Sequence, residues 1–428
     1  MTPDPAARPS ASPAVLQVTL RDLVGQRFNG CQLHRSLRAR DWDSRMLVVE
    51  KRSDDPRVHG HTRAGEWLGW GVYAAERVTS LQGLLSPLAA TIPLRRCFRD
   101  ADIVHWHLVY PHFVSLPLMP LLARRRPTVW TLHDPWALTG HCVHPLDCAR
   151  WRTGCGRCPD LKRDFTVWSD TTALVWNVKR RMYHRSPLTL VVASRWMKSR
   201  VEESPLLSSH PCHVIPFGLD LGTWRPLDRL ACRSRLGLPP DAKVIAFRMP
   251  SGEKHRLAKG IPWLVEALHR LPAGTATHLL VFEDQGQLTA LQDRYRLVEL
   301  GWLDDEQRMA GALTAADVFV MPSLAESFGL MALEAMACGT AVIASDGTAV
   351  MELIRPPLAG LGVPPRDAAA LAQALADLLG DDTRREAMGA AGRGIVESDY
   401  SSAAYVESHA GLYEALAARR TFARPEAR

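Results

Sequence analysis

The sequence lacks any hydrophobic run long enough to cross a membrane. Its longest apolar stretch, residues 108–123, is shorter than the roughly 20 residues that a spanning helix needs, and it is interrupted by Pro111, Pro117 and Pro120. Residues 2–13 alternate proline, alanine and serine without an apolar core, so they match neither an export signal nor a foldable segment. We therefore predict a disordered tail over residues 1–13 and a cytoplasmic protein, which could also sit at the inner face of the cytoplasmic membrane.

Acidic residues are too few to balance the basic ones. The chain has 52 lysines and arginines against 45 aspartates and glutamates, which gives a net charge of +7. Basic clusters occur at residues 95–96, 124–126 and 179–181. Each cation near an anionic leaflet contributes up to about 1 kcal/mol, so these clusters could hold the chain loosely at a membrane; a solvated basic surface is the alternative. We expect no nucleic-acid partner, because such a partner would leave the acidic motif described below unexplained.

The length of 428 residues is too great for one ordinary core and fits two domains. Short apolar runs alternate with longer segments of helical period, which is typical of parallel sheets with crossover helices. The predicted class is α/β, with two doubly wound Rossmann-like domains facing a central cleft at the carboxyl ends of the strands. The predicted strands are residues 15–19, 46–49, 103–105, 128–132, 188–193 and 213–216, then 244–247, 278–282, 296–300, 318–321 and 341–344.

Two glutamates flank a turn that is predicted to open a helix. Glu326 precedes the sequence Phe328-Gly329-Leu330, and Glu334 follows further down the helix. The backbone N–H groups of the turn would lie at the positive end of the helix, where a pyrophosphate can be held without a dedicated cation. The carboxylates could accept hydroxyl hydrogens on either side. This is the outline of a nucleotide-sugar, with a hexose, a diphosphate and a ribose in a row; a capped core helix with solvated glutamates is the alternative.

This glutamate segment resembles the signature of family-4 retaining glycosyltransferases, which have the GT-B fold. Residues 215–220, Ile-Pro-Phe-Gly-Leu-Asp, resemble the family's hinge segment, although Phe217 stands where asparagine is usual. Residues 300–303, Leu-Gly-Trp-Leu, resemble the segment that reads the nucleobase. The resemblance covers roughly residues 15–415. It implies an acceptor-side domain at residues 14–218, a nucleotide-sugar-binding domain at 219–400 and a helix at 401–418 that packs back on the first domain.

The resemblance also implies roles for single residues of the second domain. Glu326 would hold hydroxyls of the donor sugar, and Glu334 would hold the ribose. Lys259, followed by a glycine, would neutralise the diphosphate, for which the compact charge of a lysine is suited. A helix N-terminus and one or two cations would stabilise the charge that grows on the leaving nucleoside diphosphate, so we expect no cofactor for catalysis. The donor-side candidates are Glu326, Lys259, Glu334, Phe328, Gly329, Leu330, Arg248, Arg256, Trp302 and Leu303.

The first domain would supply the acceptor side. His133 follows a buried strand and resembles the family's active-site histidine; the alternative is a histidine that closes the strand by hydrogen bonding. His105 and His107 alternate on a strand end and so share one face, as a metal pair or as a polar strand terminus. Related enzymes have a Gly-Gly-Ala-like loop after the first strand that approaches the donor or acceptor, so Gly30 is a further donor-binding candidate; here only Gly30 keeps that backbone freedom. This departure indicates altered acceptor choice or a weakened enzyme.

Four of the nine cysteines fall within seventeen residues, in the pattern C-x5-C-x6-C-x2-C. Four thiolates can close a tetrahedral zinc site, so we predict structural zinc. A pair of disulfides and free thiols are the alternatives, and His141 and His144 are possible substitute ligands. The predicted zinc ligands are Cys142, Cys148, Cys155 and Cys158.

The sequence around these cysteines resembles one branch of the family, the bacterial exopolysaccharide enzymes of the colanic-acid type. We therefore predict a retaining glycosyltransferase that moves a hexosyl unit from a UDP- or GDP-sugar to a glycan or lipid-linked saccharide. The first alternative is a glycosyltransferase-like protein that binds sugar nucleotides without turnover, which Phe217 and the altered loop at Gly30 favour. The second is a zinc-stabilised basic binding module.

Overall fold

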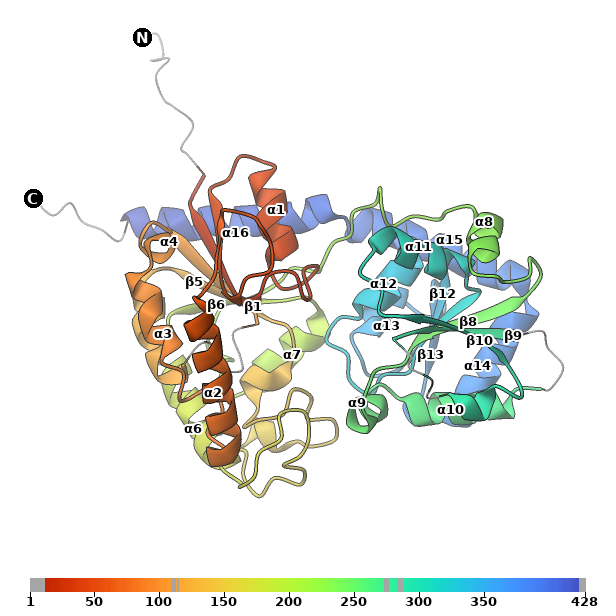
Figure 1. The fold of residues 1–428 in the computed structure, drawn as a ribbon, viewed down its shortest axis with the longest axis horizontal. Coiled ribbons are helices and arrows are strands. Elements are labelled where there is room, and N and C mark those ends of the chain that lie inside the picture. Colours follow the sequence, from red (N-terminus) through yellow and green to blue (C-terminus); the bar gives the residue numbers. More distant parts are fainter. Residues whose placement is uncertain are drawn as a thin grey trace, which may run out of the picture. The chain divides into compact units, whose positions relative to one another are not determined.

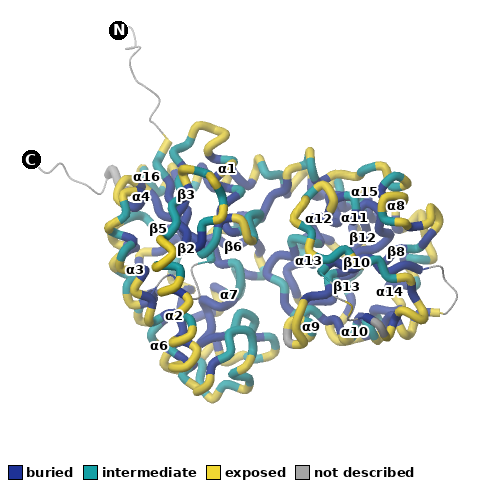
Figure 2. The backbone as a smooth tube through the Cα atoms, in the orientation of Figure 1, coloured by how far each residue is buried: buried dark blue, intermediate teal, exposed yellow. Residues whose placement is uncertain are grey.

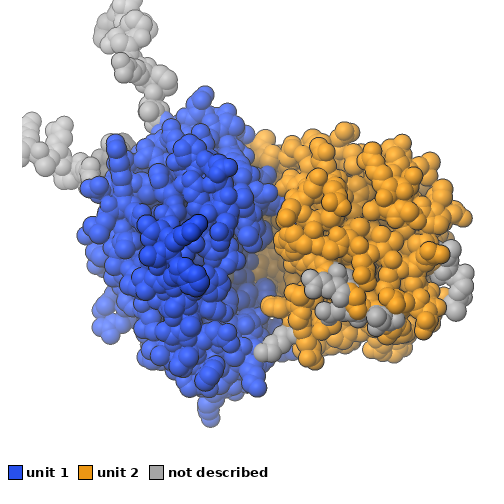
Figure 3. Space-filling view, viewed as in Figure 1, with its two compact units in different colours: residues 1–192, 198–215, 406–428 blue, residues 193–197, 216–405 orange. Residues whose placement is uncertain are grey.

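The structure is a computed structural model that describes residues 12–108, 113, 115–272, 277–283, 286 and 288–422. Apart from Ser12 and Pro13, the predicted disordered tail lies outside these residues. The chain divides into two compact units, shown in Figure 3. Unit 1 consists of Met1–Val192, Lys198–Ile215 and Val406–Arg428, and unit 2 consists of Ala193–Met197 and Pro216–Tyr405. The sequence predicts the division between residues 218 and 219, close to the boundary at Ile215 and Pro216.

Unit 1 is built on a seven-stranded sheet in the order β3-β2-β1-β4-β5-β6-β7, with every pairing parallel. Its strands are β1 (Val15–Arg21), β2 (Ser44–Glu50), β3 (Val58–His59), β4 (Ile103–Trp106), β5 (Thr128–Leu132), β6 (Leu188–Val192) and β7 (Cys212–Val214). Its helices are α1 (Cys31–Arg38), α2 (Arg63–Thr79), α3 (Leu88–Thr91), α4 (Arg96–Arg99), α5 (Met119–Arg125) and α6 (Thr172–Tyr183), with short turns η1 (Ile92–Leu94), η2 (Leu116–Leu118), η3 (Pro135–Leu138) and η4 (Arg150–Arg152).

Unit 2 has a six-stranded sheet in the order β10-β9-β8-β11-β12-β13, which is also parallel throughout. Its strands are β8 (Lys243–Arg248), β9 (Thr277–Phe282), β10 (Arg296–Gly301), β11 (Val318–Met321), β12 (Ala341–Ser345) and β13 (Gly360–Val363). Its helices are α8 (Arg229–Arg235), α9 (Glu253–Ala258), α10 (Ile261–Arg270), α11 (Glu306–Ala315), α12 (Leu330–Ala337), α13 (Val350–Ile354), α14 (Ala368–Gly380) and α15 (Asp382–Asp399), with the turn η5 (Thr289–Leu291). Two helices, α7 (Arg195–Glu203) and α16 (Ser402–Phe422), have residues in both units.

Most strands of the two sheets are buried on both faces, as parallel strands covered by helices must be, whereas the edge strands β7 and β10 are partly exposed. Figure 1 shows helices around each sheet, and Figure 2 shows buried strands inside each unit with exposed positions concentrated on the helices and loops. In unit 2 the core joins residues of β8, β9, β11 and β12 to residues of α10 and α14. The predicted class, with two doubly wound α/β halves, is confirmed.

Two strands escaped the sequence analysis, each for a physical reason. β3 has only two residues, too few to show an alternating pattern. β13 reads Gly-Leu-Gly-Val, and glycine weakens any strand signal. Its first residue must nevertheless be glycine, because a Cβ atom at Gly360 would lie 2.2 Å from the carbonyl oxygen of Val342 on the neighbouring strand. Within the described residues, no helix is both long and apolar enough to span a bilayer.

Candidate functional site

Two parts of the predicted donor site that are far apart in the sequence meet in an ion pair. Glu326 lies in the loop that follows β11, and Lys259 follows α9. The Nζ atom of Lys259 donates a hydrogen bond to Oε2 of Glu326 at 2.7 Å. The side chains are 30% and 17% exposed, so a ligand could reach both. The structure therefore brings together a cation and a carboxylate at the carboxyl edge of the sheet, where parallel α/β sheets bind their ligands.

The Lys259 segment is seated directly against the segment that leads to Glu326. The backbone N–H of Leu324 donates to the carbonyl oxygen of Ala258 at 2.9 Å. Gly260 has φ +73°, and a Cβ atom there would lie 1.8 Å from the carbonyl oxygen of Pro322. Only glycine fits this close approach, which explains why the lysine is followed by glycine.

Gly329 forms the N-cap of α12, the glutamate helix. Its φ is +97°, and a Cβ atom would lie 2.6 Å from Cγ2 of Val350, so glycine is required for both reasons. Gly329 has no side chain with which to cap this helix. Its first N–H groups are therefore available to an anion. Glu334 lies on the same helix and is fully buried.

Phe217, which replaces the usual asparagine, packs against the glutamate motif. Its ring lies 5.2 Å from the ring of Phe328 at an interplanar angle of 84°. Phe328 also contacts Tyr400, with ring centroids 6.1 Å apart. Edge-to-face pairs of this kind stabilise a buried cluster. Phenylalanine at position 217 therefore contributes a packing contact to the turn at Gly329. The difference from asparagine is thus no strong argument that the protein has lost its activity.

The remaining donor-side candidates follow strands that end at the same edge of the sheet. Arg248, the last residue of β8, makes a two-pronged ion pair with Glu283, at 2.7 and 2.9 Å. Arg256 lies one turn before Lys259 in α9, and within the part of the chain that the structure describes it forms no ion pair. Trp302 follows β10 and is 64% exposed, and Leu303 beside it is half-buried.

Unit 1 holds a buried histidine network that reaches from the sheet to the C-terminal helix. His105 on β4 bonds through Nδ1 to the hydroxyl of Tyr413 on α16 at 2.6 Å, and through Nε2 to Oγ1 of Thr131 on β5 at 2.7 Å. His107 bonds through Nε2 to Oε1 of Gln17 on β1 at 2.8 Å. The rings of His105 and His107 are 4.0 Å apart, so the two share one face as predicted. Both side chains hydrogen-bond to other residues of unit 1, as expected for a polar strand terminus. Among the described residues, no group of three or more potential metal ligands lies here.

His133 extends this network toward the end of β5. Its ring lies 5.6 Å from that of His107 and 5.7 Å from that of Phe28. Both ring nitrogens are shielded from solvent, and this burial lowers the pKa of His133 to about 3. The imidazole is therefore neutral at physiological pH. Gly30 packs against His107, because a Cβ atom at Gly30 would come within 2.4 Å of Nε2 of that histidine.

Asn29 orders the loop before Gly30, a role that the sequence analysis missed. Its side-chain amide donates to the carbonyl oxygens of Arg21, Asp22 and Val24, and its Oδ1 accepts the N–H of Cys31. The side chain is almost fully buried. The only available signal was an asparagine before a glycine, which is common in turns of every kind.

The zinc prediction is not supported. Among the described residues, which include all four candidate cysteines, no group of three or more potential ligands could hold a metal ion. Two of the sulfurs have local partners instead: Cys155 Sγ accepts the N–H of Gly140 at 3.2 Å, and Cys158 Sγ lies 3.3 Å from Nε2 of His141. Burial raises the pKa of Cys142 to about 12 and that of Cys155 to about 11, so both are protonated thiols at neutral pH.

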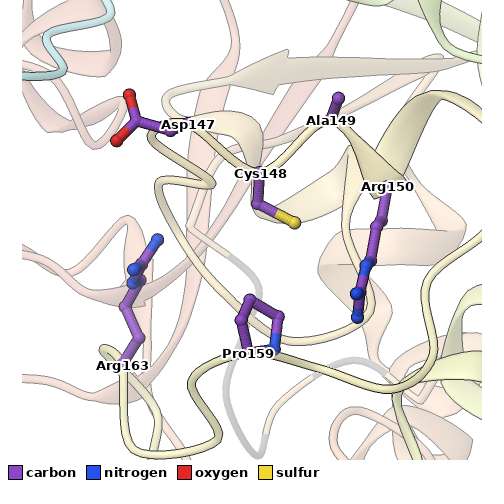
Figure 4. Close-up of a pocket in the computed structure, with 6 residues that line it drawn as sticks. All are labelled: Asp147, Cys148, Ala149, Arg150, Pro159 and Arg163. Carbon is purple, nitrogen blue, oxygen red and sulfur yellow. The ribbon is translucent and has the colours of Figure 1, made fainter.

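A pocket of about 390 Å³ opens in the same loop region (Figure 4). Cys148 stands between Arg150 and Arg163, which lie on opposite sides of the pocket. The remaining lining residues are Asp147, Ala149 and Pro159. Its position is in unit 1, outside the donor-side candidates.

One residue of a predicted basic cluster does not lie at the surface, although Arg180 and Arg181 beside it are exposed. Lys179 is fully buried, and its Nζ donates to the carbonyl oxygens of Trp136 at 2.6 Å and Thr139 at 2.9 Å. Burial lowers the pKa of Lys179 to about 7. The lysine holds together the loop after β5 and cannot serve as a membrane contact.

Two family models match the chain. The model described as glycosyltransferase family 4 matches residues 31–223, and the one described as glycosyl transferases group 1 matches residues 251–381. The first match lies mainly in unit 1 and the second lies in unit 2. Both halves of the chain are therefore accounted for by glycosyltransferase families.

Several proteins with similar sequences are named as glycosyltransferases or synthases of sugar phosphates. A D-inositol 3-phosphate glycosyltransferase of Xylanimonas cellulosilytica is 36% identical over 197 residues, which are 42% of this chain and 46% of that protein, so the chain spans about half of its length. An alpha-maltose-1-phosphate synthase of Mycobacterium tuberculosis is 28% identical over 364 residues, 80% of this chain and 86% of that protein. A putative colanic acid biosynthesis glycosyl transferase of Escherichia coli, WcaC, is 26% identical over 263 residues, 59% of this chain and 62% of that protein.

Solved structures share the fold. Sucrose-phosphate synthase from Thermosynechococcus elongatus matches with a TM-score of 0.67 at 21% identity, over 95% of this chain and 100% of that chain. Anabaena HepE in complex with UDP and glucose matches with a TM-score of 0.63 at 15% identity, over 94% of this chain and 99% of that chain. The chain therefore has the GT-B fold, and its two halves match a glycosyltransferase family 4 model and a glycosyl transferases group 1 model.

Proposed function

We propose that this glycosyltransferase is a retaining enzyme that moves a hexosyl unit from a UDP- or GDP-sugar to a glycan or lipid-linked saccharide. The observation that carries the proposal is the contact between Lys259 and Glu326 beside the uncapped N-terminus of α12. A cation, a carboxylate and free backbone donors within one loop cluster are the groups that a diphospho-sugar requires.

In this proposal each group at the edge of the sheet in unit 2 has one role. Lys259 and the first N–H groups of α12 bind the diphosphate and stabilise the charge that develops on it as the glycosidic bond breaks. Glu326 exchanges its bond with Lys259 for hydroxyls of the sugar. Arg256 is the better candidate for a second cation, because Arg248 is already held by Glu283. Glu334 accepts the ribose hydroxyls.

The leaving phosphate itself takes the proton of the acceptor hydroxyl, so the side chains need only bind and orient the two substrates. His133 fits such a role on the acceptor side because its imidazole is neutral and can exchange hydrogen bonds with sugar hydroxyls. The GT-B protein HepE has been solved with UDP-glucose, which supports a nucleotide-sugar donor.

The pathway is the finer part of the proposal. The similarity to WcaC, named for colanic acid biosynthesis, supports exopolysaccharide or other cell-surface polysaccharide biosynthesis. Other relatives are named D-inositol 3-phosphate glycosyltransferase and alpha-maltose-1-phosphate synthase, so the acceptor class has to be decided by assay.

Glu326→Gln tests the proposal. Transfer from the donor should be lost, while the melting temperature stays near that of the wild type, because a partly exposed carboxylate is replaced by an isosteric amide. The matched control is Glu266→Gln, which removes another ion-paired glutamate, on the exposed side of α10. Transfer at the native rate by Glu326→Gln would refute the assignment of the donor site. Donor binding without any turnover by the wild type would favour the alternative of a degenerate enzyme.

A further inference from the structure

Helix α2 of unit 1 turns its apolar side chains away from the protein. Trp67 is 76% exposed and Val78 is 62% exposed, and Leu68 and Trp70 are close to half exposed. The buried positions of the same helix are Gly69, Val72 and Glu76. A surface helix normally buries its apolar stripe and exposes its charges, so this helix is reversed. Figure 1 shows α2 on the outside of unit 1.

The outward face of α2 is almost free of polar groups along its length. Positions 64, 67, 71, 74 and 78, which follow one another at helical spacing, are Ala, Trp, Gly, Ala and Val, and all five are exposed. The two carboxylates of α2 lie elsewhere: Glu66 is half-buried and Glu76 is buried. Arg63 and Arg77 are exposed at the two ends of the helix. The face is therefore an apolar strip with a cation at each end.

Segments next to the two ends of α2 expose the same kinds of side chain. Near the start of α2, Arg95 bonds to His61, and beside it Leu94 is 75% exposed. At the other end, Ser80 Oγ accepts the backbone N–H of Trp168, and this tryptophan is 71% exposed. Tryptophan, leucine and arginine together are the composition that proteins place at the interface between water and lipid.

We propose that α2 lies flat on an anionic phospholipid surface, with Trp67 and Val78 inserted among the acyl chains and the arginines on the headgroups. Charge decides between a bilayer and a second copy of the chain. A symmetric dimer through this face would bring arginines against arginines, with no exposed carboxylate of α2 to pair with them. An anionic bilayer supplies the missing negative charge. The proposal rests on the proposed function only for its purpose, which is access to a lipid-linked acceptor.

Vesicle sedimentation with the full-length protein tests the proposal. Wild-type protein should sediment with phosphatidylcholine vesicles that contain phosphatidylglycerol, and less with phosphatidylcholine alone. Trp67→Ser with Val78→Ser should lower the partition coefficient by about tenfold or more, because two exposed apolar side chains are lost. The matched control, Leu230→Ser with Leu358→Ser, removes two exposed apolar side chains from unit 2 and should bind as the wild type does. Trp67→Ser alone gives a smaller change of the same sign.

Results that contradict the membrane contact can be told apart from results that contradict the proposed function. Failure of the wild type to bind anionic vesicles, or an equal loss in both double variants, would overturn the proposal. A dimer in solution that the α2 variant abolishes would show that a second copy covers the face. Thermal shift with UDP- and GDP-sugars on the same samples reports on the donor site in unit 2, so a failure there would count against the proposed function and leave the membrane contact standing.

Discussion

Gly260→Ala should damage the candidate donor site without touching a charged side chain. The backbone at Gly260 has φ +73°, and a Cβ atom would sit 1.8 Å from the carbonyl oxygen of Pro322. Contacts of this kind essentially never fall below 3.0 Å in proteins, so the segments that carry Lys259 and Glu326 must shift relative to each other. The added Cβ atom is fixed directly to the backbone, and the atom that it meets is a backbone carbonyl oxygen, so no flexible side chain can move to relieve the clash.

The expected magnitude has two parts. An L-residue in the left-handed conformation costs about 1–2 kcal/mol, and overpacking against a fixed group adds about 1–3 kcal/mol. The free energy of unfolding of unit 2 should fall by about 2–5 kcal/mol, which lowers its melting temperature by about 5–15 °C. Gly237→Ala is the matched control, because Gly237 has φ +66° and open space around the added Cβ atom. That variant should show only the conformational part of the cost.

Calorimetry of unfolding and titration with the donor separate the two effects. Gly260→Ala should bind the donor at least about tenfold more weakly than the wild type, a loss of about 1.4 kcal/mol. Gly237→Ala should bind it with the wild-type affinity. If the two variants melt at the same temperature and bind the donor equally well, the close approach at Pro322 does not position Lys259, and the reasoning is wrong.

Two further predictions concern unit 1. Burial lowers the pKa values of His105, His107 and His133, so the unfolded chain binds more protons at acid pH than the folded chain does. The free energy of unfolding should therefore fall as the pH drops below the unfolded pKa of about 6.5, by about 1.4 kcal/mol for each histidine one pH unit below that value. A melting temperature of unit 1 that stays constant between neutral and mildly acid pH would contradict this. Burial raises the pKa of Cys142 to about 12 and that of Cys155 to about 11. Iodoacetamide should therefore alkylate both thiols about 100-fold more slowly than a small thiol at mildly alkaline pH, as measured by peptide mass spectrometry. Equal rates would show that the two thiols are exposed or ionised.

The fold was readable from the sequence because parallel strands leave a strong local signal. β8, β11 and β12 are short, nearly continuous apolar runs between longer segments of helical period. What the sequence could not show is how residues far apart meet. The bond between His105 and Tyr413 joins positions separated by 308 residues, and no local pattern marks either residue as a partner of the other.

The zinc site and the surface position of Lys179 are two predictions that the structure does not support, for the same reason. Spacing along the chain does not fix where side chains point, and the sulfurs of Cys155 and Cys158 turn to Gly140 and His141. Lys179 reads as part of a basic surface cluster but lies inside the unit, held by two carbonyl oxygens. Helix α2 is the opposite case, in which the structure shows a feature that the sequence does not predict. Its apolar side chains are exposed, and this is known only once the burial of each residue is known.

The most direct test of the donor site is calorimetric titration of UDP- and GDP-linked hexoses into the wild type and Lys259→Ala. Lys243→Ala, which removes a lysine paired with Asp382 in the same unit, is the matched control. We expect the wild type and the control to bind one of these donors. Lys259→Ala should bind it about 30-fold more weakly or worse, because the diphosphate loses its cation. Binding of the donor by Lys259→Ala with the wild-type affinity, or no binding of any donor by the wild type, would contradict this expectation.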